Sequence, residues 1–235
     1  MSRFADHADH PPFSYAAYKS SVKRGPREPL VEIAQTLSER TGPGPAYARV
    51  EREDADLTTN AGTGGAAIGE RIIVTGQVRD QTGRPLPNVL IELWQANASG
   101  RYVHWRETAF PAPLDPNFVG VGQCITDADG VYRFQTIKPG AYPWGNHPNA
   151  WRPAHIHFSL LGPTLNARLI TQMYFPHDPQ FALDPIYQAV PARARERLVA
   201  AYDHGVTKEN WALGYRWDIT LFGAQATPTE LGGAR

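Results

Sequence analysis

The chain has 235 residues, of which 42% are hydrophobic and 20% are charged, so it can bury a sizeable core, and general disorder is excluded. Basic and acidic residues balance at 23 each, which leaves no overall field to attract nucleic acid or an anionic membrane and favours small molecules or protein surfaces as partners. A single cysteine excludes an intramolecular disulfide, and the first residues contain no apolar run for a signal peptide, so we expect a cytoplasmic protein.

The composition of residues 1–69 indicates an extended N-terminal arm rather than a domain. Proline and glycine are clustered there, and only Leu30–Arg40 offers a plausible short helix. A basic cluster consists of Lys19, Lys23, Arg24 and Arg27. Tyr15 and Tyr18 lie beside this cluster, where the arm could meet an anionic ligand, and the alternative is a solvated basic loop. Such an arm needs a surface to pack on, either its own core or a neighbouring subunit.

From residue 70 onward, short apolar runs alternate with turn residues. The expected strands are 71–80, 88–95, 123–126, 131–136, 154–161, 168–175 and 211–222. The turns at 81–87 and 127–130 each separate two of these strands, which predicts two hairpin-like pairs. A calcium loop beginning at Asp127 is excluded, because its twelfth position is Lys138 rather than glutamate.

One convincing helix is expected at Pro191–Tyr202, with proline at its start and Gly205 beyond its end. Cys124 lies in an expected strand, where we predict a buried apolar residue rather than a nucleophile. Many short strands, few helices and long Pro-rich connections indicate an all-β fold, a β-sandwich with long functional loops. We expect this domain to span residues 70–225 and a C-terminal tail to occupy 226–235.

Two histidines separated by one residue, His155 and His157, end a Pro-rich segment. On a β-strand their side chains project to the same side, so they could hold one metal ion between them. Tyr142 lies upstream, just past a Pro139-Gly140 turn and among too many prolines for a helix. The alternatives are an exposed polar histidine pair and a tyrosine that serves only as a core or rim aromatic.

A second tyrosine, Tyr102, follows a Gly-containing turn at the end of strand 88–95. Imidazole suits zinc, copper, nickel or iron, whereas a phenol with a free pKa of about 10 ionises at neutral pH only beside a strongly Lewis-acidic ion. Fe(III) meets that demand. Two phenolates and one hydroxide would cancel its three positive charges, so the centre could be buried without a large desolvation cost.

The segments WQANASGRY, APLDPNF, TDADGVYRF, TIKPGAYPW and WRPAHIHF, in this order, resemble the intradiol ring-cleavage dioxygenases. The similarity covers nearly the whole chain, including YKSSVKRGPREPLVEI in the arm. It implies a mixed β-sandwich, a mononuclear non-haem Fe(III) and a paralogous α subunit whose interface closes the active site. The implied ligands are Tyr102, Tyr142, His155 and His157. The residues implied around substrate and oxygen are Tyr18, Arg24, Trp144, Arg152, Gln172 and Ile186. After Tyr102 this chain reads VHWRETAFPA, which is longer than the family pattern and lacks its second tyrosine.

The charge count agrees with the chemistry that the resemblance implies. A catechol that binds as a dianion keeps the centre neutral if it displaces hydroxide and one tyrosinate, and the resemblance implies that Tyr142 is the ligand that leaves. Reaction with O2 then cleaves the ring between the two hydroxyl-bearing carbons to give a muconate. Arg152 could stabilise negative charge on the ring, or could be a structural arginine that bonds carbonyls. Tyr18 and Arg24 could select a ring carboxylate.

Three alternative classes stay open. An Fe(II) oxygenase of the extradiol or cupin type needs two histidines and a carboxylate, and no acid lies close after His157 in the sequence. A zinc hydrolase needs a third nitrogen, sulphur or carboxylate ligand and leaves the tyrosines unexplained. A non-catalytic partner subunit should lack the ligands. The ring substituent of the catechol is also open among carboxylate, hydroxyl, sulphonate and none.

Overall fold

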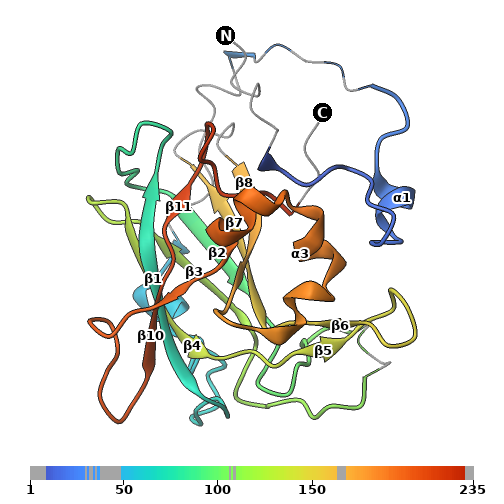
Figure 1. Cartoon of the computed structure of the whole chain (residues 1–235). Helices are drawn as coiled ribbons and strands as arrows, with labels where there is room; N and C mark the ends of the chain where they lie inside the picture. Colours follow the sequence, from blue (N-terminus) through green and yellow to red (C-terminus); the bar gives the residue numbers. More distant parts are fainter. Residues whose placement is uncertain are drawn as a thin grey trace.

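Apolar side chains at alternating strand positions fill the space between two β-sheets, as the computed structural model of the chain shows (Figure 1). The structure describes residues 9–29, 31, 34, 36–37, 49–105, 107, 110–162 and 168–230. The first sheet contains β1 (Arg71–Arg79), β4 (Val131–Ile137), β9 (Ala201–Tyr202), β10 (Leu213–Arg216) and β11 (Ile219–Thr220). The second has the order β3 (Val121–Ile125), β2 (Leu90–Trp94), β7 (His155–Leu161), β8 (Arg168–Tyr174). A short pair, β5 (Tyr142–Pro143) and β6 (Trp151–Arg152), stands apart from both.

The first sheet mixes strand directions, whereas the second is antiparallel throughout. β1 pairs in parallel with β10 and β11 and antiparallel with β4. In the second sheet, β7 lies between β2 and β8. These pairings confirm the expected all-β fold of mixed sheets.

The core lies between the sheets and is densely aromatic around β7. Ile156, Phe158 and Leu160 of β7 are fully buried, and the ring of Phe158 makes edge contacts with Tyr132 and Trp217 at centroid distances of 5.8 and 5.0 Å. Burying one such side chain contributes about 1.5–3 kcal/mol. Because neighbouring residues of a strand point to opposite faces, this inward set places the histidines of β7 on the outer face of the sheet.

Both expected hairpins are wrong. β1 and β2 lie in different sheets, as do β3 and β4, so the turns at 81–87 and 127–130 carry the chain across the sandwich. Turn residues fix where a chain reverses, but the partner of a strand is decided by which apolar faces pack together. Gly130, with φ +71°, supplies the left-handed residue of the second turn.

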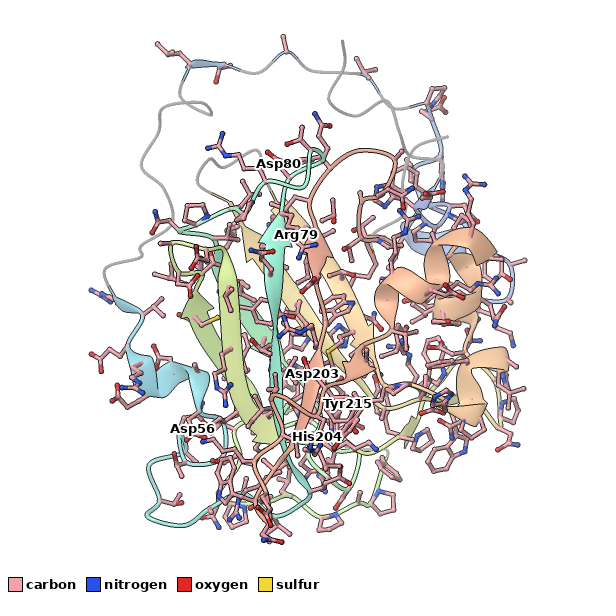
Figure 2. The ribbon with its side chains drawn as sticks, turned by 60° about the vertical axis from the view of Figure 1, so that its left-hand side comes forward. Asp56, Arg79, Asp80, Asp203, His204 and Tyr215 are labelled. Carbon is pink, nitrogen blue, oxygen red and sulfur yellow. The ribbon has the colours of Figure 1, made fainter. Side chains whose placement is uncertain are left out.

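The expected strand 211–222 is two strands. Between β10 and β11, Trp217 donates its backbone N–H to Thr75, and the Asp218 carboxylate accepts from the N–H of Gln77. The chain stays in register with β1 across this break, because Thr75 pairs with Arg216 before it and Val78 pairs with Ile219 after it. In Figure 2 the view also shows Asp56 at one end of the sandwich and Arg79 and Asp80 at the opposite end.

The helix expected at Pro191–Tyr202 is wrong in type and in its end. The structure has a 3-10 helix, η5 (Ala192–Leu198), followed by β9. After Leu198 the chain becomes extended, and Ala200 donates its N–H to Tyr174 at the end of β8. Tertiary pairing therefore overrides the local helical pattern.

The other helical segments are short, namely α1 (Ser21–Arg24), η3 (Arg52–Ala55), η4 (Pro179–Ala182) and α3 (Pro185–Ala189). Most of the expected helix Leu30–Arg40 lies outside the described residues. Within the described part of the chain, no helix is long and apolar enough to cross a membrane.

Both ends of the described chain lie near β8 (Figure 1). Asp9 forms ion pairs with Arg193 and Arg197 of η5. The C-terminal tail runs along β8, where Thr229 and Glu230 both donate hydrogen bonds to the Ile170 carbonyl. The segment before β1 also packs on the core, because Leu57 is fully buried.

Candidate metal centre

Two histidine rings on the outer face of β7 form the base of the candidate site. The centroids of His155 and His157 lie 4.9 Å apart. His155 is buried, and the side chain of His157 retains 14% of its exposure. The ring of His157 stacks on Trp94 of β2 at 4.8 Å with an interplanar angle of 5°. The strand therefore presents both imidazoles on one side, as their spacing predicts.

Two tyrosines from separate loops complete a cluster of four rings. Tyr142 on β5 places its hydroxyl 3.3 Å from the Nε2 atom of His155. Tyr102 packs edge-on against Tyr142, with ring centroids 5.4 Å apart, and lies 6.3 Å from the ring of His157. The four expected ligands thus lie side by side, although Tyr102 is at least 40 positions from each of the other three in the sequence.

Glycine allows the two tyrosine loops to touch. Gly100 has φ +79°, and a Cβ there would stand 2.3 Å from the Ala141 carbonyl oxygen. At Gly140 a Cβ would stand 2.5 Å from the carbonyl oxygen of Ala98. Asn97 ties the same loops together, because its backbone carbonyl accepts from Gly140 while its side chain accepts from the N–H of Arg101. The close backbone approach brings Tyr102 against Tyr142.

The electrostatics of the four rings fit a highly charged cation. Burial and then the neighbouring Tyr142 hydroxyl raise the pKa of Tyr102 well above its usual value. The Tyr102 hydroxyl is buried and has no hydrogen-bond partner within the described residues. Burial, followed by the charge of Arg152, lowers the pKa of His155, and burial also lowers the pKa of His157. The site thus offers neutral imidazoles and a phenol that ionises only beside a strong Lewis acid.

Hydrogen bonds at the Nδ1 atoms define the orientation of each imidazole. His155 Nδ1 lies 2.7 Å from the Pro153 carbonyl oxygen, and His157 Nδ1 lies 3.0 Å from Glu230 Oε2. Both oxygens are acceptors, so each Nδ1 carries the proton and each Nε2 keeps its lone pair. In this structure Arg152 Nη1 donates to His155 Nε2 at 3.0 Å, and a metal ion would replace that bond.

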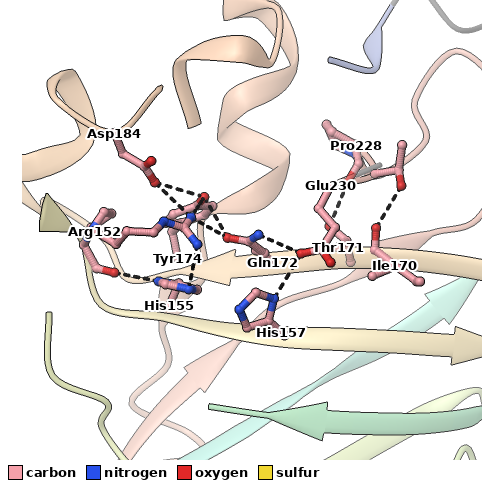
Figure 3. A network of polar contacts seen from close by, with 12 residues as sticks. Arg152, His155, His157, Ile170, Thr171, Gln172, Tyr174, Asp184, Pro228 and Glu230 are labelled. Carbon is pink, nitrogen blue, oxygen red and sulfur yellow. Dashed lines mark hydrogen bonds and ion pairs between the residues drawn. The ribbon is translucent and has the colours of Figure 1, made fainter. Parts of the chain in front are cut away.

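Arg152 sits at the centre of a buried polar network (Figure 3). Its Nη2 atom donates to Gln172, Tyr174 and Asp184 at 2.6, 3.0 and 3.0 Å. Asp184 is fully buried, and its other oxygen accepts from the N–H of Ile186 at the start of α3. Burial lowers the pKa of Arg152, but the charges of Tyr174 and Asp184 outweigh it and the net shift is upward. The guanidinium therefore stays charged beside the rings.

Sequence reasoning did not identify Tyr174, Asp184 or Glu230 as parts of this region. Asp184 followed by Pro185 is a helix-start signal, so it could have been found as a cap, but not as the partner of Arg152. Glu230 lies 73 positions from His157, and no local pattern joins them.

A cavity of about 420 Å³ lies beside the network, enclosed by the arm, β8, α3 and the tail. Four of the predicted substrate residues line it, namely Tyr18, Arg24, Gln172 and Ile186. Arg24 donates to the Tyr18 hydroxyl and lies over its ring. Trp144 packs against Tyr18 with ring centroids 5.5 Å apart. None of the four expected ligands lines the cavity.

Glu230 and Gln172 connect the cavity to the rings. Both line the cavity, and Gln172 Nε2 donates to Glu230 Oε2 at 2.6 Å. No group of three His, Cys, Asp or Glu side chains suited to a metal ion occurs in the described part of the chain.

Comparisons with known proteins agree with this geometry. A family model described as "Dioxygenase" matches residues 43–223, and one described as "Protocatechuate 3,4-dioxygenase beta subunit N terminal" matches residues 5–36. The chain is 54% identical to the protocatechuate 3,4-dioxygenase beta chain of Burkholderia cepacia over 225 residues, 96% of this chain and 95% of that one. The alpha chain from the same organism is 27% identical over 84% of this chain and 98% of its own length.

More distant relatives match smaller parts of the chain. Hydroxyquinol 1,2-dioxygenase of Rhizobium sp. is 31% identical over 51% of this chain, which covers only 42% of that protein. The crystal structure of 3-chlorocatechol 1,2-dioxygenase from Rhodococcus opacus 1CP superimposes with a TM-score of 0.55 and 26% identity, over 73% of this chain and 65% of that one. The structural similarity to this dioxygenase thus extends over most of the chain.

Proposed function

The chain belongs to the intradiol dioxygenase family, and from this premise we propose that it is the catalytic β chain of a protocatechuate 3,4-dioxygenase. The reaction joins protocatechuate (3,4-dihydroxybenzoate) and O2 to give 3-carboxy-cis,cis-muconate, a step of aromatic catabolism in the β-ketoadipate pathway. The cluster of Tyr102, Tyr142, His155 and His157, with one buried hydroxyl lacking a described partner, carries the mechanistic proposal. The 54% identity to a protocatechuate-cleaving relative supports the substrate.

These four residues would hold one non-haem Fe(III). When bound, the ferric ion supplies a Lewis acid that draws electron density from a chelated catechol and permits its reaction with O2. The chain's own residues handle the protons. Tyr142 would accept one of the two catechol protons at its phenolate oxygen and cease to be a ligand, and the displaced hydroxide would accept the second proton and leave as water. Tyr102, His155 and His157 would remain the protein ligands. Charge neutrality is kept without a separate strong base.

Arg152 would stabilise negative charge that develops on the ring. Its charge is fixed by buried acceptors before substrate arrives, so little reorganisation is needed during reaction. Tyr18 and Arg24 would meet the ring carboxylate, while Trp144 and Ile186 shape the pocket and Gln172 orients Arg152.

A paralogous α subunit is the proposed partner, forming αβ protomers in a larger hetero-oligomer. The relation to an alpha chain along 84% of this sequence supports a paired architecture, because paralogous folds can pack as pseudo-symmetric partners. Co-expression with an α-type chain should therefore raise turnover above that of the isolated β chain.

The iron proposal is tested by colour and metal content. Purified protein should hold about one iron per chain and absorb visible light through tyrosinate-to-iron charge transfer. His157→Ala should lose both iron and colour, because one of four ligands is gone. His204→Ala is the matched control, since His204 is exposed on the loop between β9 and β10 (Figure 2), and it should keep both. A colourless protein that holds one zinc ion per chain would contradict the proposal of a ferric site.

Turnover on a catechol panel tests the substrate. We expect protocatechuate to be cleaved with the highest kcat/KM, ahead of catechol, hydroxyquinol and a sulphonated catechol. Preference for an uncharged ring would show that Tyr18 and Arg24 do not select a carboxylate.

A further inference from the structure

We propose that Glu230, on the C-terminal tail, is a positioning residue for the metal centre that holds His157 in the orientation and tautomer needed to bind metal. The inference rests on the proposed function, because it concerns the same iron site. It is carried by a further contact outside the four-ring cluster: the carboxylate of Glu230 meets the edge of the His157 ring (Figure 3).

The Glu230 carboxylate is fixed from two directions. Its Oε2 atom lies 3.0 Å from His157 Nδ1 and 2.6 Å from Gln172 Nε2. Its side chain is mostly shielded, with 19% of its surface exposed. A charged acceptor held by two donors in a shielded place makes stronger hydrogen bonds than one in water. The carboxylate is therefore a preorganised acceptor rather than a mobile surface acid.

The tail that carries Glu230 is attached to β8 next to the histidine strand. The backbone N–H of Glu230 donates to Ile170 at 2.8 Å, and Thr171 Oγ1 donates to the Pro228 carbonyl at 2.7 Å. Gln172 stands opposite His157 in the β7–β8 register. The strand pairing and the tail contacts thus bring the carboxylate to the edge of the His157 ring.

This contact determines which nitrogen of His157 is available. A carboxylate can only accept, so the ring nitrogen that faces it carries the proton, and Nε2 keeps its lone pair. The stack on Trp94 fixes the plane of the ring, and Glu230 fixes its rotation within that plane. Together the two contacts define the direction of the lone pair.

The two histidines differ in this support. His155 donates to a neutral backbone carbonyl, that of Pro153, whereas His157 donates to a carboxylate. A carboxylate raises the electron-donating strength of the imidazole more than a carbonyl does. We therefore assign His157 as the stronger donor of the pair, with Glu230 as the cause.

The test uses the full chain with Glu230→Ala or Glu230→Gln. Each variant is expressed, purified and loaded with iron in the same way as the parent protein. Glu230→Ala should lose iron to a chelator about 10- to 100-fold faster than the parent, the usual effect of removing such a partner. The charge-transfer band of its remaining iron should move to longer wavelength, because a weaker His157 donor leaves the ferric ion more electron-poor. Glu230→Gln keeps an acceptor oxygen but no charge, so it should retain iron better than the alanine variant and still show a shifted band.

Glu209→Ala is the control, because Glu209 is exposed on the loop before β10, where its carboxylate accepts a hydrogen bond from the neighbouring Asn210. It should match the parent in iron loss and in band position. Thermal unfolding of each metal-free variant separates loss of positioning from loss of folding.

The outcomes are distinct. Glu230 variants with the parent's chelation rate and band position would overturn the inference and leave the iron proposal intact. Parent protein without iron or a charge-transfer band would overturn the proposed function itself. A chelation change that Glu209→Ala reproduces would also count against a specific role for Glu230.

Discussion

A single buried guanidinium, that of Arg152, joins most of the polar groups around the candidate site. The spacing of His155 and His157 and the charge count pointed to a ferric site, and the resemblance to the intradiol dioxygenases supplied the full set of expected ligands. The partners of Arg152 could not be selected in this way, because Asp184 lies 32 positions away and meets it only after α3 has docked. Cys124 was predicted as an apolar residue, and its burial, which raises the pKa of the thiol to about 12, confirms this.

Arg152→Ser should lower the free energy of unfolding of the metal-free chain by about 3–5 kcal/mol, because Asp184 would be left buried and unpaired. Arg152→Met combined with Asp184→Asn should recover most of that loss, since asparagine is neutral and still caps α3. Urea unfolding measures both.

Arg216→Ser provides the comparison for the Arg152 variants. The Arg216 side chain, which pairs with Asp203, is half exposed, so this substitution should lower the free energy of unfolding by less than about 1 kcal/mol. A double variant no more stable than Arg152→Ser would show that the unpaired Asp184 charge is not the cause.

At the scale of elements, β1 organises the first sheet by pairing with three strands of both directions. Its alternating apolar residues predicted the strand, and turn residues predicted where the chain reverses. Neither signal could predict that β1 and β2 separate into different sheets, because partner choice depends on residues far along the chain. The parallel partners of β1 come from the last described strands, β10 and β11.

Gly76 of β1 shows how close that late pairing is. A Cβ at Gly76 would stand 1.8 Å from the Trp217 carbonyl oxygen, between β10 and β11. Gly76→Ala should therefore lower the free energy of unfolding by about 3 kcal/mol or more, at the upper end of overpacking effects.

Gly145→Ala is the control for Gly76→Ala, because nothing lies within 4 Å of the added Cβ and the backbone is not left-handed there. Its effect should remain within about 0.5 kcal/mol. Equal unfolding midpoints for the two variants in urea would contradict the steric explanation.

At the scale of the whole molecule, the N-terminal arm and the C-terminal tail wall the same cavity. The sequence indicated an arm that needs a surface, and the described part of the arm packs on η5 and on the loop that holds Asn146. The surface that the arm covers could not be predicted from the sequence, because the ion pairs that anchor it join residue 9 to residues 193 and 197, which lie far along the chain.

Acid should loosen this anchor. Burial raises the pKa of Asp9, but hydrogen bonds from Arg197 and Arg193 outweigh it and hold the pKa below its usual 3.8. Because the pKa of Asp9 is lower in the folded than in the unfolded chain, its ionised carboxylate stabilises the folded state above about pH 3.8. That stabilisation is lost as the pH falls through the folded-state pKa.

Asp9→Asn should therefore be less stable than the parent at pH 7, and the difference should shrink below pH 3.8. Urea unfolding of both proteins at several pH values between 3 and 7 measures this. A difference that is constant over this range would show that the Asp9 charge does not stabilise the arm.

The meeting of the arm and the tail at one cavity also bears on how the protein should be engineered. Residues 11–26 and 228–230 border the same space, so a bulky group attached within either segment would crowd the proposed substrate cavity. The turn at Gly83 is a better point of attachment, because nothing lies within 4 Å of a Cβ added there. This turn follows the Arg79 end of β1, whereas the Tyr142 loop follows Ile137, which pairs with Arg71 at the other end of β1.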